Sequence, residues 1–435
     1  MSFSIRDPIL ENITCTADER ALINSPLVQR LKWVTQLSLV NHVFNGATHS
    51  RFAHSLGALS TAGEYMTHLL ETVSDREWRK HDMTMTLSSS YPYFKEHYIK
   101  LARVAGLLHD VGHGPFSHSF DKTIYQKIYG IPDGGHDLAR INLVTHELIY
   151  EHLEENINPE ELVELWSPGS VPSFSAQDKS MFNIIRNIVE GPLGADRIDF
   201  TRRDSHNIGM QHLGTIPASR IIQNSKIVFV NNVPTLSYHA KCIEDIIRTL
   251  DGRLSMYTSV YLHKTSVAAS LLVEKMMDLI CEPFGLVEMT KDPDQFKRLT
   301  DHKIFAMISE WCPPSPIKAE DLAEVRNIKR AQQLYEQLMD RQLPKMEHEV
   351  RINDFTTPFN EQHYVDLWYP NRDPSTFIIY CSRPISGISA AKFDKYGIVF
   401  HDNNDKLYTC QELLDSIGYT VPIKPFYIVR GYVFR

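Results

Sequence analysis

The stretch L-A-R-V-A-G-L-L-H-D-V-G-H-G-P-F-S-H-S-F-D, residues 101–121, constrains the fold of this chain more than any other. Apolar residues surround the axis of the helix that its first half predicts, so this helix should be buried. The helix ends in His109-Asp110. Burying an unpaired carboxylate is costly, so this pair requires a cation or hydrogen-bond partners. The sequence therefore predicts a polar site at the end of a buried helix.

Further histidines and carboxylates follow within a few residues. An isolated His-Asp pair is more typical of a satisfied histidine at a helix end, but here His113, His118 and Asp121 lie within twelve residues of His109. Upstream, T-H-S-R-F-A-H-S-L-G places Arg51 and His54 on one face of a helix. Downstream, A-D-R-I-D-F-T-R-R-D-S-H offers Asp196, Arg197, Asp199, Arg203 and Asp204. A histidine, a His-Asp pair and a distant aspartate suit a hydrolytic Mn, Fe, Mg or Zn centre.

Length and composition place the chain among ordinary globular proteins. Its 435 residues suggest about two to three domains. The net charge of -8 gives no global case for nucleic-acid binding, although a local basic groove stays open. The six cysteines include no C-x-x-C pair, and no apolar run is long enough to span a membrane. We expect a soluble intracellular protein, cytoplasmic or nuclear, without a signal peptide.

Periodicity predicts a mainly helical protein with a change of character after Pro283. The expected helices cover residues 26–37, 50–70, 98–111, 138–156, 177–189, 240–281 and 317–343. Residues 74–93 are expected to form a connection, and Asn231-Asn232 a hairpin turn within 227–236. Strands are expected at 377–380, 397–401 and 426–434. We place a domain boundary near residue 285, between a helical core (1–285) and a smaller α+β module (286–435).

Five blocks in this order carry a resemblance to a known family. They are Q-R-L-K-W-V-T-Q-L, H-S-R-F-A-H-S-L-G, G-L-L-H-D-V-G-H-G-P-F-S-H-S-F-D, T-H-E and A-D-R-I-D-F-T-R-R-D-S-H-N-I-G. Together they resemble the HD-domain deoxynucleoside triphosphate triphosphohydrolases over about residues 5 to 285. The likeness is greatest to the branch with a sterile-alpha-motif ahead of the HD domain. The resemblance implies a helical HD-domain phosphohydrolase core and cleavage of a deoxynucleoside triphosphate into deoxynucleoside and inorganic triphosphate.

The resemblance also implies roles for single residues. The divalent metal would be held by His54, His109, Asp110 and Asp196, and it would polarise a phosphoryl oxygen or a water. Near the phosphates it implies three catalytic histidines, His113, His118 and His146, with Asp121 orienting His118. The remaining substrate contacts would be Arg51, Arg197 and Arg253 for the triphosphate, and Gln36, Leu37, Asp204 and Tyr261 for the sugar. A tight wall at the sugar would reject a 2′-hydroxyl.

Several positions depart from that branch. Arg197 replaces a lysine, Phe200 a tyrosine and Tyr257 a histidine, which bears on substrate preference. At the regulatory site of that branch, Asn24 and Lys32 replace an aspartate and an arginine, while Gln29 is kept. Activation by a guanine nucleotide such as dGTP is therefore not carried over with the resemblance.

Three functions are compatible with these residues. The first is dNTP hydrolysis with manganese or magnesium as candidate ions. The second is a nuclease or phosphodiesterase that uses the same centre on nucleic acid, and the third is a sensor that binds a nucleotide without turning it over. The C-terminal module is expected to support regulation or a homo-oligomer, either a dimer or a tetramer.

Overall fold

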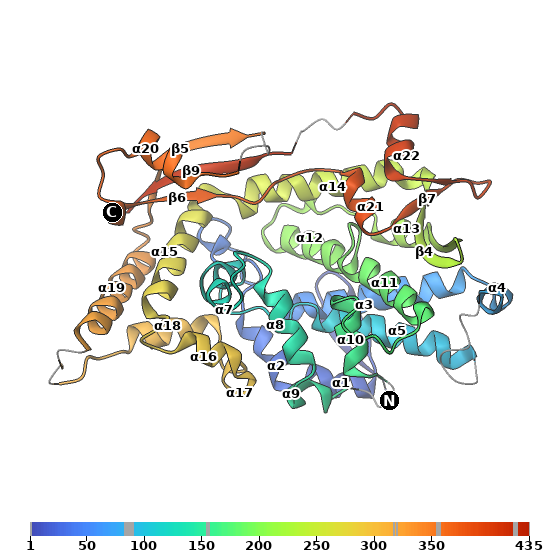
Figure 1. Cartoon of the computed structure of the whole chain (residues 1–435), viewed down its shortest axis with the longest axis horizontal. Helices are drawn as coiled ribbons and strands as arrows, with labels where there is room; N and C mark the ends of the chain where they lie inside the picture. Colours follow the sequence, from blue (N-terminus) through green and yellow to red (C-terminus); the bar gives the residue numbers. More distant parts are fainter. Residues whose placement is uncertain are drawn as a thin grey trace.

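The protein is described by a computed structural model that covers residues 2–81, 91–153, 157–315, 318, 321–353, 358–420 and 425–434. Helices dominate, and three small sheets accompany them (Figure 1). The expectation of a mainly helical core with a smaller α+β C-terminal part is confirmed. None of the helices in the described part combines the length and apolar character that a membrane span requires.

The first two thirds of the chain contain most of the helices. They are α1 (Ala17–Ile23), α2 (Pro26–Arg30), α3 (Arg51–Glu71), α4 (Asp75–Lys80), α5 (Tyr91–Leu108), α6 (His118–Phe120), α7 (Gln126–Tyr129), α8 (Gly135–Val144), α9 (Glu147–Tyr150), α10 (Pro159–Trp166), α11 (Ala176–Glu190), α12 (Ala195–Asn207), α13 (Ala218–Gln223), α14 (Ile243–Met256) and α15 (Lys264–Ile280). Short turns of 3-10 or π type are η1 (Leu31–Trp33), η2 (Val40–His42), η3 (Asp121–Tyr125), η4 (Gln211–Leu213), η5 (Ala240–Cys242) and η6 (Tyr257–Tyr261).

The last third adds further helices and most of the strands. Its helices are α16 (Leu286–Lys291), α17 (Pro293–Phe296), α18 (Asp301–Ser309), α19 (Leu322–Met339), α20 (Glu361–Trp368), the 3-10 turn η8 (Pro374–Thr376), α21 (Ala390–Lys395) and α22 (Cys410–Ser416). One sheet has the order β5 (Lys345–Ile352), β9 (Tyr427–Val433), β6 (Phe377–Cys381). Another has the order β3 (Ser225–Val230), β4 (Val233–His239), β7 (Val399–His401), β8 (Leu407–Tyr408), and β1 (Phe3–Asp7) pairs with β2 (Glu11–Cys15).

Pairing of β4 with β7 joins segments from either side of residue 285. Ser237 lies opposite Val399 in a parallel register, and the β3–β4 hairpin turns at Asn231-Asn232 as expected. Both asparagines have a positive φ, which suits this residue type in a tight hairpin turn. The two parts thus share a sheet, and the domain boundary near residue 285 stays a prediction.

Residues 26–37 do not form the single helix that was expected. The α-helix ends at Arg30, and Thr35 instead pairs with Ser50 in an isolated β-bridge. The backbone N–H of Gln36 donates to the carbonyl of His49 at 3.0 Å. These long-range hydrogen bonds replace the helical ones, so tertiary context overrides the apolar period.

Other expected helices differ mainly in their ends. The expected helix 138–156 is divided into α8 and α9, and 240–281 is interrupted by the π turn η6 between α14 and α15. The connection at 74–93 contains α4, which Ser74 caps. Its residues 82–90, like 154–156 and parts of 316–320, lie outside the described residues.

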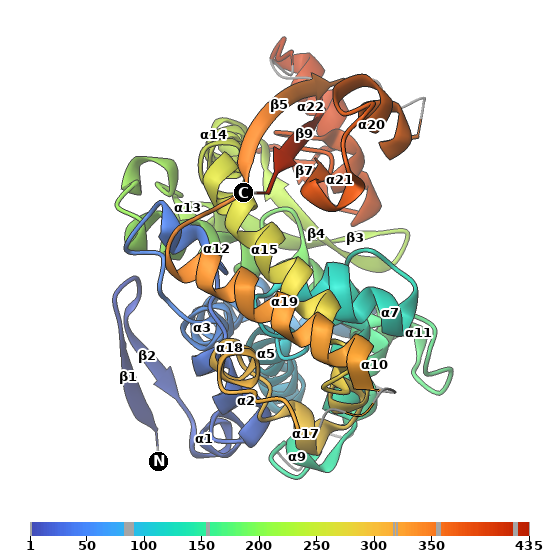
Figure 2. The ribbon, with the colours of Figure 1, turned by 90° about the vertical axis from the view of Figure 1, so that its left-hand side faces the viewer.

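The centre of the core is the contact between α3 and α5 (Figure 2). Both helices are almost fully buried where they meet, with Leu59, Ala62, Ala102 and Ala105 inaccessible to solvent. A Cβ added at Gly106 would lie 2.7 Å from the carbonyl oxygen of Ala58. The helices can approach this closely only because residue 106 has no side chain.

We expect Gly106→Ala to lower the free energy of unfolding by about 1–3 kcal/mol, because the added methyl forces α5 away from α3. Urea unfolding followed by circular dichroism measures this change. Glu64→Ala, at an exposed position of α3, is the control and should change stability little. Equal stability of the two variants would contradict the close-packing argument.

Candidate metal and phosphate site

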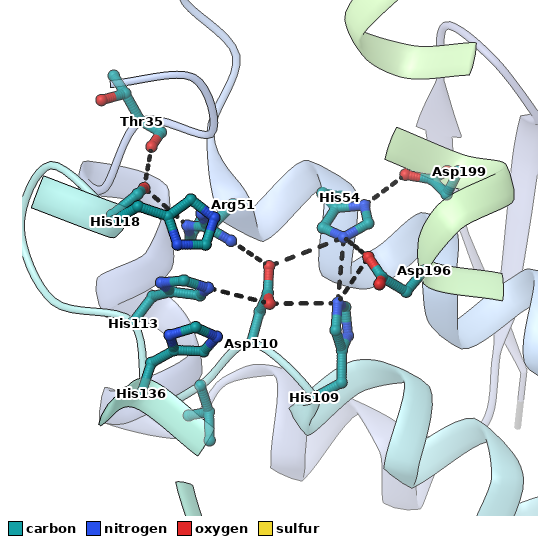
Figure 3. Close-up of polar contacts among 12 residues, drawn as sticks. Thr35, Arg51, His54, His109, Asp110, His113, His118, His136, Asp196 and Asp199 are labelled. Carbon is teal, nitrogen blue, oxygen red and sulfur yellow. Dashed lines mark hydrogen bonds and ion pairs between the residues drawn. The ribbon is translucent and has the colours of Figure 1, made fainter. Parts of the chain in front are cut away.

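Four predicted metal ligands meet where the ends of α3, α5 and α12 come together (Figure 3). His54 comes from α3, His109 and Asp110 directly follow α5, and Asp196 lies in the first turn of α12. The ligand atoms of His54, His109 and Asp196 all lie within 4.8 Å of one another. Asp110 borders this group, with Oδ1 3.3 Å from His109 Nε2 and Oδ2 3.7 Å from His54 Nε2.

The orientation of the two imidazoles tests whether a cation fits here. His54 Nδ1 donates to Asp199 at 2.8 Å, and His109 Nδ1 donates to the carbonyl of Gly106 at 2.7 Å. In its neutral form each ring presents its Nε2 lone pair, and these two nitrogens are 3.1 Å apart. Asp196 Oδ1 lies 3.2 Å from the first and 3.5 Å from the second. Two lone pairs and a carboxylate at these distances repel one another unless a cation lies among them.

The electrostatics of the cluster point the same way. Burial opposes protonation of His54, but its hydrogen bonds to Asp196 and Asp199 raise its pKa to about 10. The pKa of His109 is also raised, because the charges of Asp110 and Asp196 outweigh the effect of burial. The cluster therefore attracts positive charge, either as protons or as a metal ion. Its nitrogen and carboxylate donors suit a divalent cation.

A chain of buried ion pairs holds His54 in place. Asp199 accepts two hydrogen bonds from Arg203, at 2.8 and 2.9 Å, besides the one from His54. Arg203 also pairs with Asp7 at 2.7 Å. Asp199 and Arg203 are each 1% exposed, so the chain is shielded from water. Such partners fix the tautomer and direction of a metal-binding histidine.

Arg51 pairs with Asp110, the predicted metal ligand that borders the other three. Its Nη1 lies 2.5 Å from Asp110 Oδ2, and its Nε donates to Ser117 Oγ at 2.9 Å. Although burial opposes ionisation, the charges of Arg51 and the neighbouring histidines hold the pKa of Asp110 well below its usual range. Asp110 is thus a permanent carboxylate that faces both Arg51 and the ligand cluster.

A second cluster contains three histidines around one aspartate. Asp121 Oδ2 lies 3.1 Å from His118 Nδ1, the contact that the resemblance implied, and 2.8 Å from His136 Nδ1. His136 stacks on His113 with ring centroids 3.7 Å apart (Figure 3). His113 Nε2 in turn lies 3.4 Å from Asp110 Oδ1. The cluster therefore adjoins the proposed metal ligands.

The structure brings His136, and not His146, into this cluster. His146 lies at the N-terminus of α9, where its Nδ1 accepts from the backbone of Leu148, and it does not line the cavity. The catalytic role expected of His146 stays a prediction, and its position outside the cavity lining does not support it. Gly112 is the sequence feature connected with His136, because a Cβ at residue 112 would lie only 2.1 Å from the carbonyl oxygen of His136. The glycine after the His-Asp pair is thus required for the approach of the segment that carries His136.

Both clusters open into one cavity of about 660 Å³. This volume is in the range of ligand pockets for small molecules. The predicted residues that line it are Gln36, Leu37, Arg51, His109, Asp110, His113, His118, Asp196, Arg197, Asp204, Arg253 and Tyr261. His54 and Asp121 lie behind this lining, in contact with it.

One end of the cavity is built around Asp204. Asp204 Oδ2 accepts from the hydroxyl of Tyr261 at 2.7 Å, and its Oδ1 lies 2.8 Å from His49 Nε2. Leu37 and Tyr261 pack in one apolar cluster next to this carboxylate. Gln36 Oε1 is buried there and has no hydrogen-bond partner among the described residues. This end combines an apolar wall with an unsatisfied polar atom.

The predicted phosphate contacts Arg197 and Arg253 lie on α12 and α14. Arg253 is buried and donates a hydrogen bond to the carbonyl of Pro192 at 3.2 Å. Arg197 likewise donates to a carbonyl, that of Glu190. Burial and the charge of Arg197 lower the pKa of Arg253 to about 10. Neither guanidinium group forms an ion pair within the described residues, so the two are suited to bind an anion.

The substituted positions Phe200 and Tyr257 also line the cavity. Other lining residues escaped the sequence prediction, because no local motif marks them. They include Asp133, Asp137, Arg140 and Glu190 from the helical part and Arg383, Ser386, Lys392 and Tyr396 from the C-terminal part.

Comparison with known proteins gives a family for this region. Residues 51–167 match the HD domain family model. The chain carries an HD domain. An HD domain-containing protein of Acanthamoeba polyphaga mimivirus is 28% identical over 92% of this chain and 85% of its own length. Deoxynucleoside triphosphate triphosphohydrolase SAMHD1 is 24% identical over 68% of this chain in Bos taurus and 25% over 74% in Homo sapiens.

The matched region covers about half of each of these SAMHD1 proteins, 52% of their length in both cases. The resemblance to HD-domain dNTP triphosphohydrolases is thus borne out at low identity. The HD domain and the His/Asp cluster together support a metal-dependent phosphohydrolase.

We expect Asp199→Asn to weaken binding of Mn²⁺ by about 10–100-fold, because an amide cannot hold His54 and Arg203 as a carboxylate does. Competition with a fluorescent chelator measures the affinity. Asp278→Asn, at a half-exposed aspartate of α15 outside the cavity, is the control. Unchanged Mn²⁺ affinity in Asp199→Asn would show that His54 does not depend on this partner.

Proposed function

We propose that this protein hydrolyses deoxynucleoside triphosphates to the deoxynucleoside and inorganic triphosphate. The observation that carries this proposal is a single cavity of about 660 Å³ that joins the His/Asp cluster, the Asp204 end and two arginines, Arg197 and Arg253, which form no ion pair in the described part of the chain. These are the groups required by a metal ion, a polyphosphate and a sugar. The similarity to proteins named as deoxynucleoside triphosphate triphosphohydrolases supports the same substrate class.

The four residues His54, His109, Asp110 and Asp196 would hold the divalent ion. When bound, this ion supplies a Lewis acid next to the phosphoryl group. Asp110 and Arg51 remain paired at 2.5 Å, so the guanidinium reaches the same region as the ligands. Arg51 can therefore neutralise charge on the α-phosphate while Asp110 keeps its orientation.

Hydrolysis at the α-phosphorus forms a bond to the oxygen of water and breaks the bond to the 5′ oxygen. The leaving oxygen then requires a proton. The cluster around Asp121 can supply it, because hydrogen bonding to Asp121 raises the pKa of His136 against the effect of burial. Burial and the charge of Arg51 lower the pKa of His113 well below its usual range. We assign the donated proton to His136, whose Nδ1 lies 2.8 Å from Asp121 Oδ2 and whose ring stacks on His113.

The remaining parts of the substrate would occupy the two ends of the cavity. Arg197 and Arg253 would bind the phosphates beyond the scissile bond. Asp204 and Tyr261 would face the sugar, with Leu37 as the apolar wall. Asp204 already accepts from Tyr261 and His49, and the apolar wall of Leu37 and Tyr261 would crowd a 2′-hydroxyl, which favours deoxynucleotides.

The proposed enzyme is a homo-oligomer, either a dimer or a tetramer, and the assay with and without dGTP decides whether it requires a guanine-nucleotide activator. Gln29 and Lys32, at the positions of the regulatory contacts in the resembling branch, already bind each other at 2.7 Å. Gln29 also donates to the carbonyl of Ile23. Both side chains are thus engaged within one chain.

A product assay tests the proposed function. Purified protein with Mn²⁺ or Mg²⁺ is incubated with each dNTP, with and without dGTP, and separately with labelled single-stranded DNA. We expect deoxynucleoside and inorganic triphosphate in equal amounts by anion-exchange chromatography, and a loss of at least about 100-fold in Asp196→Asn. Asp196 is the least buried of the four ligands, so its replacement should preserve the fold.

The other outcomes identify the competing functions. Shortened DNA with intact dNTPs would establish the nuclease and exclude the proposed reaction. Nucleotide binding without any turnover would establish the sensor. Hydrolysis of dNTPs only when dGTP is present would establish that the enzyme requires a nucleotide activator.

We expect His136→Asn to lower kcat by about 10²–10⁴-fold, because it removes the proposed proton donor. His146→Asn is the matched control and should retain nearly full activity, since His146 does not line the cavity. Steady-state kinetics on the preferred dNTP measures both. A larger loss in His146→Asn than in His136→Asn would reverse the assignment.

A further inference from the structure

A segment from the C-terminal part forms one wall of the cavity. Residues 382–396, here called the wall segment, run from the end of β6 through α21 (Figure 1). The cavity is lined from this segment by Arg383, Pro384, Ile385, Ser386, Lys392 and Tyr396. The site therefore contains side chains that lie far beyond the HD domain match at residues 51–167.

Backbone and apolar contacts dock the wall segment onto the helical part. Ile385 exchanges two backbone hydrogen bonds with Phe426, at 2.7 and 3.0 Å, and packs with Leu254 of α14. Phe393 on α21 is fully buried in the main core. The carbonyl of Tyr396 accepts from the side chain of Asn187 on α11 at 2.9 Å. The segment is thus a fixed part of the cavity wall.

Lys392 joins Arg197 and Arg253 in a group of cations without carboxylate partners. Its Nζ donates to the neutral hydroxyl of Ser386 at 3.1 Å. Within the described residues, none of these three cations forms an ion pair, whereas Arg51 pairs with Asp110 in the same cavity. Partial burial and the charges of Arg253 and Arg197 lower the pKa of Lys392 to about 8. Positive charge therefore accumulates here without an ion-pair partner among the described residues.

Arg383 shows that the wall segment also reaches the histidine cluster. It forms an ion pair with Asp133, in the loop before His136, and its Nη2 lies 3.4 Å from His118 Nδ1. Arg383 is therefore neutralised by a carboxylate, in contrast to Lys392. Arg383 and Lys392 are the two cations of the wall segment that line the cavity. Among the described residues, Lys392 is the one of these two without an ion-pair partner, so it is available for an anionic ligand.

We infer that Lys392 binds the terminal phosphates of the substrate, so that the C-terminal part supplies a substrate-binding residue to the active site. This inference rests on the proposed function for the identity of the substrate. A polyphosphate is the ligand that matches three converging cations next to a metal-ligand cluster. The α-phosphate would lie at the metal ligands, and the distal phosphates would extend toward α21.

Calorimetric titration of the full chain tests the inference without requiring turnover. Inorganic triphosphate and inorganic phosphate are titrated, without added divalent ion, into wild type, Lys392→Gln, Lys392→Arg and Lys395→Gln. Lys395 is the matched control, because it lies on the same helix but does not line the cavity. We expect Lys392→Gln to weaken triphosphate binding by about tenfold or more, with Lys392→Arg and Lys395→Gln close to wild type.

Steady-state kinetics separates this inference from the proposed function. In Lys392→Gln we expect KM for the dNTP to rise about tenfold while kcat changes little, because the contact is made equally in the ground state. Turnover by wild type with unchanged KM and triphosphate affinity in Lys392→Gln would overturn the inference alone. Absence of turnover in wild type would overturn the proposed function, and the titration would still decide the role of Lys392. Equal weakening in Lys392→Gln and Lys395→Gln would indicate a general charge effect and overturn the inference.

Discussion

The close packing of α3 against α5 is the contact on which the site depends. His54 lies in the first turn of α3, and His109 follows the last residue of α5. These two rings meet at 3.1 Å only because Gly106 lets the helix backbones touch beside Ala58. The same contact uses the carbonyl of Gly106 to orient His109. One glycine thus serves both the packing of the core and the geometry of the ligand cluster.

Buried charge makes this arrangement costly unless each group finds a partner. The helical part satisfies the outer charges with fixed pairs, Arg203 with Asp199 and Arg51 with Asp110. The inner atoms of His54, His109 and Asp196 instead face one another. Buried electron-rich atoms that face one another repel, and a cation that binds among them relieves this repulsion. The division between satisfied outer pairs and an unsatisfied centre is what distinguishes a binding site from a structural ion-pair network.

The sequence predicted those parts of the fold and the site that are encoded locally. The apolar period and the His-Asp pair were enough to predict α5 and the residues that follow it, and alternating residues predicted the β3–β4 hairpin. His136 escaped because its position depends on tertiary contact at Gly112, while a tripeptide likeness drew attention to His146. The helix expected at 26–37 is wrong for a related reason. Its apolar period continues past Arg30, but Thr35 pairs with Ser50 instead of continuing the helix. Long-range contacts of this kind leave no periodic signal in the chain.

The wall segment illustrates the same limit and gives it a functional meaning. Nothing in S-R-P-I-S-G-I-S-A-A-K-F-D-K-Y marks it as part of the proposed phosphate site, because its position at the cavity arises from docking. Ile385 packs against Leu254 on α14. The preceding residue on this helix, Arg253, lines the cavity. A shift of the wall segment on α14 would therefore move Lys392 relative to Arg253 and change the spacing of the cations.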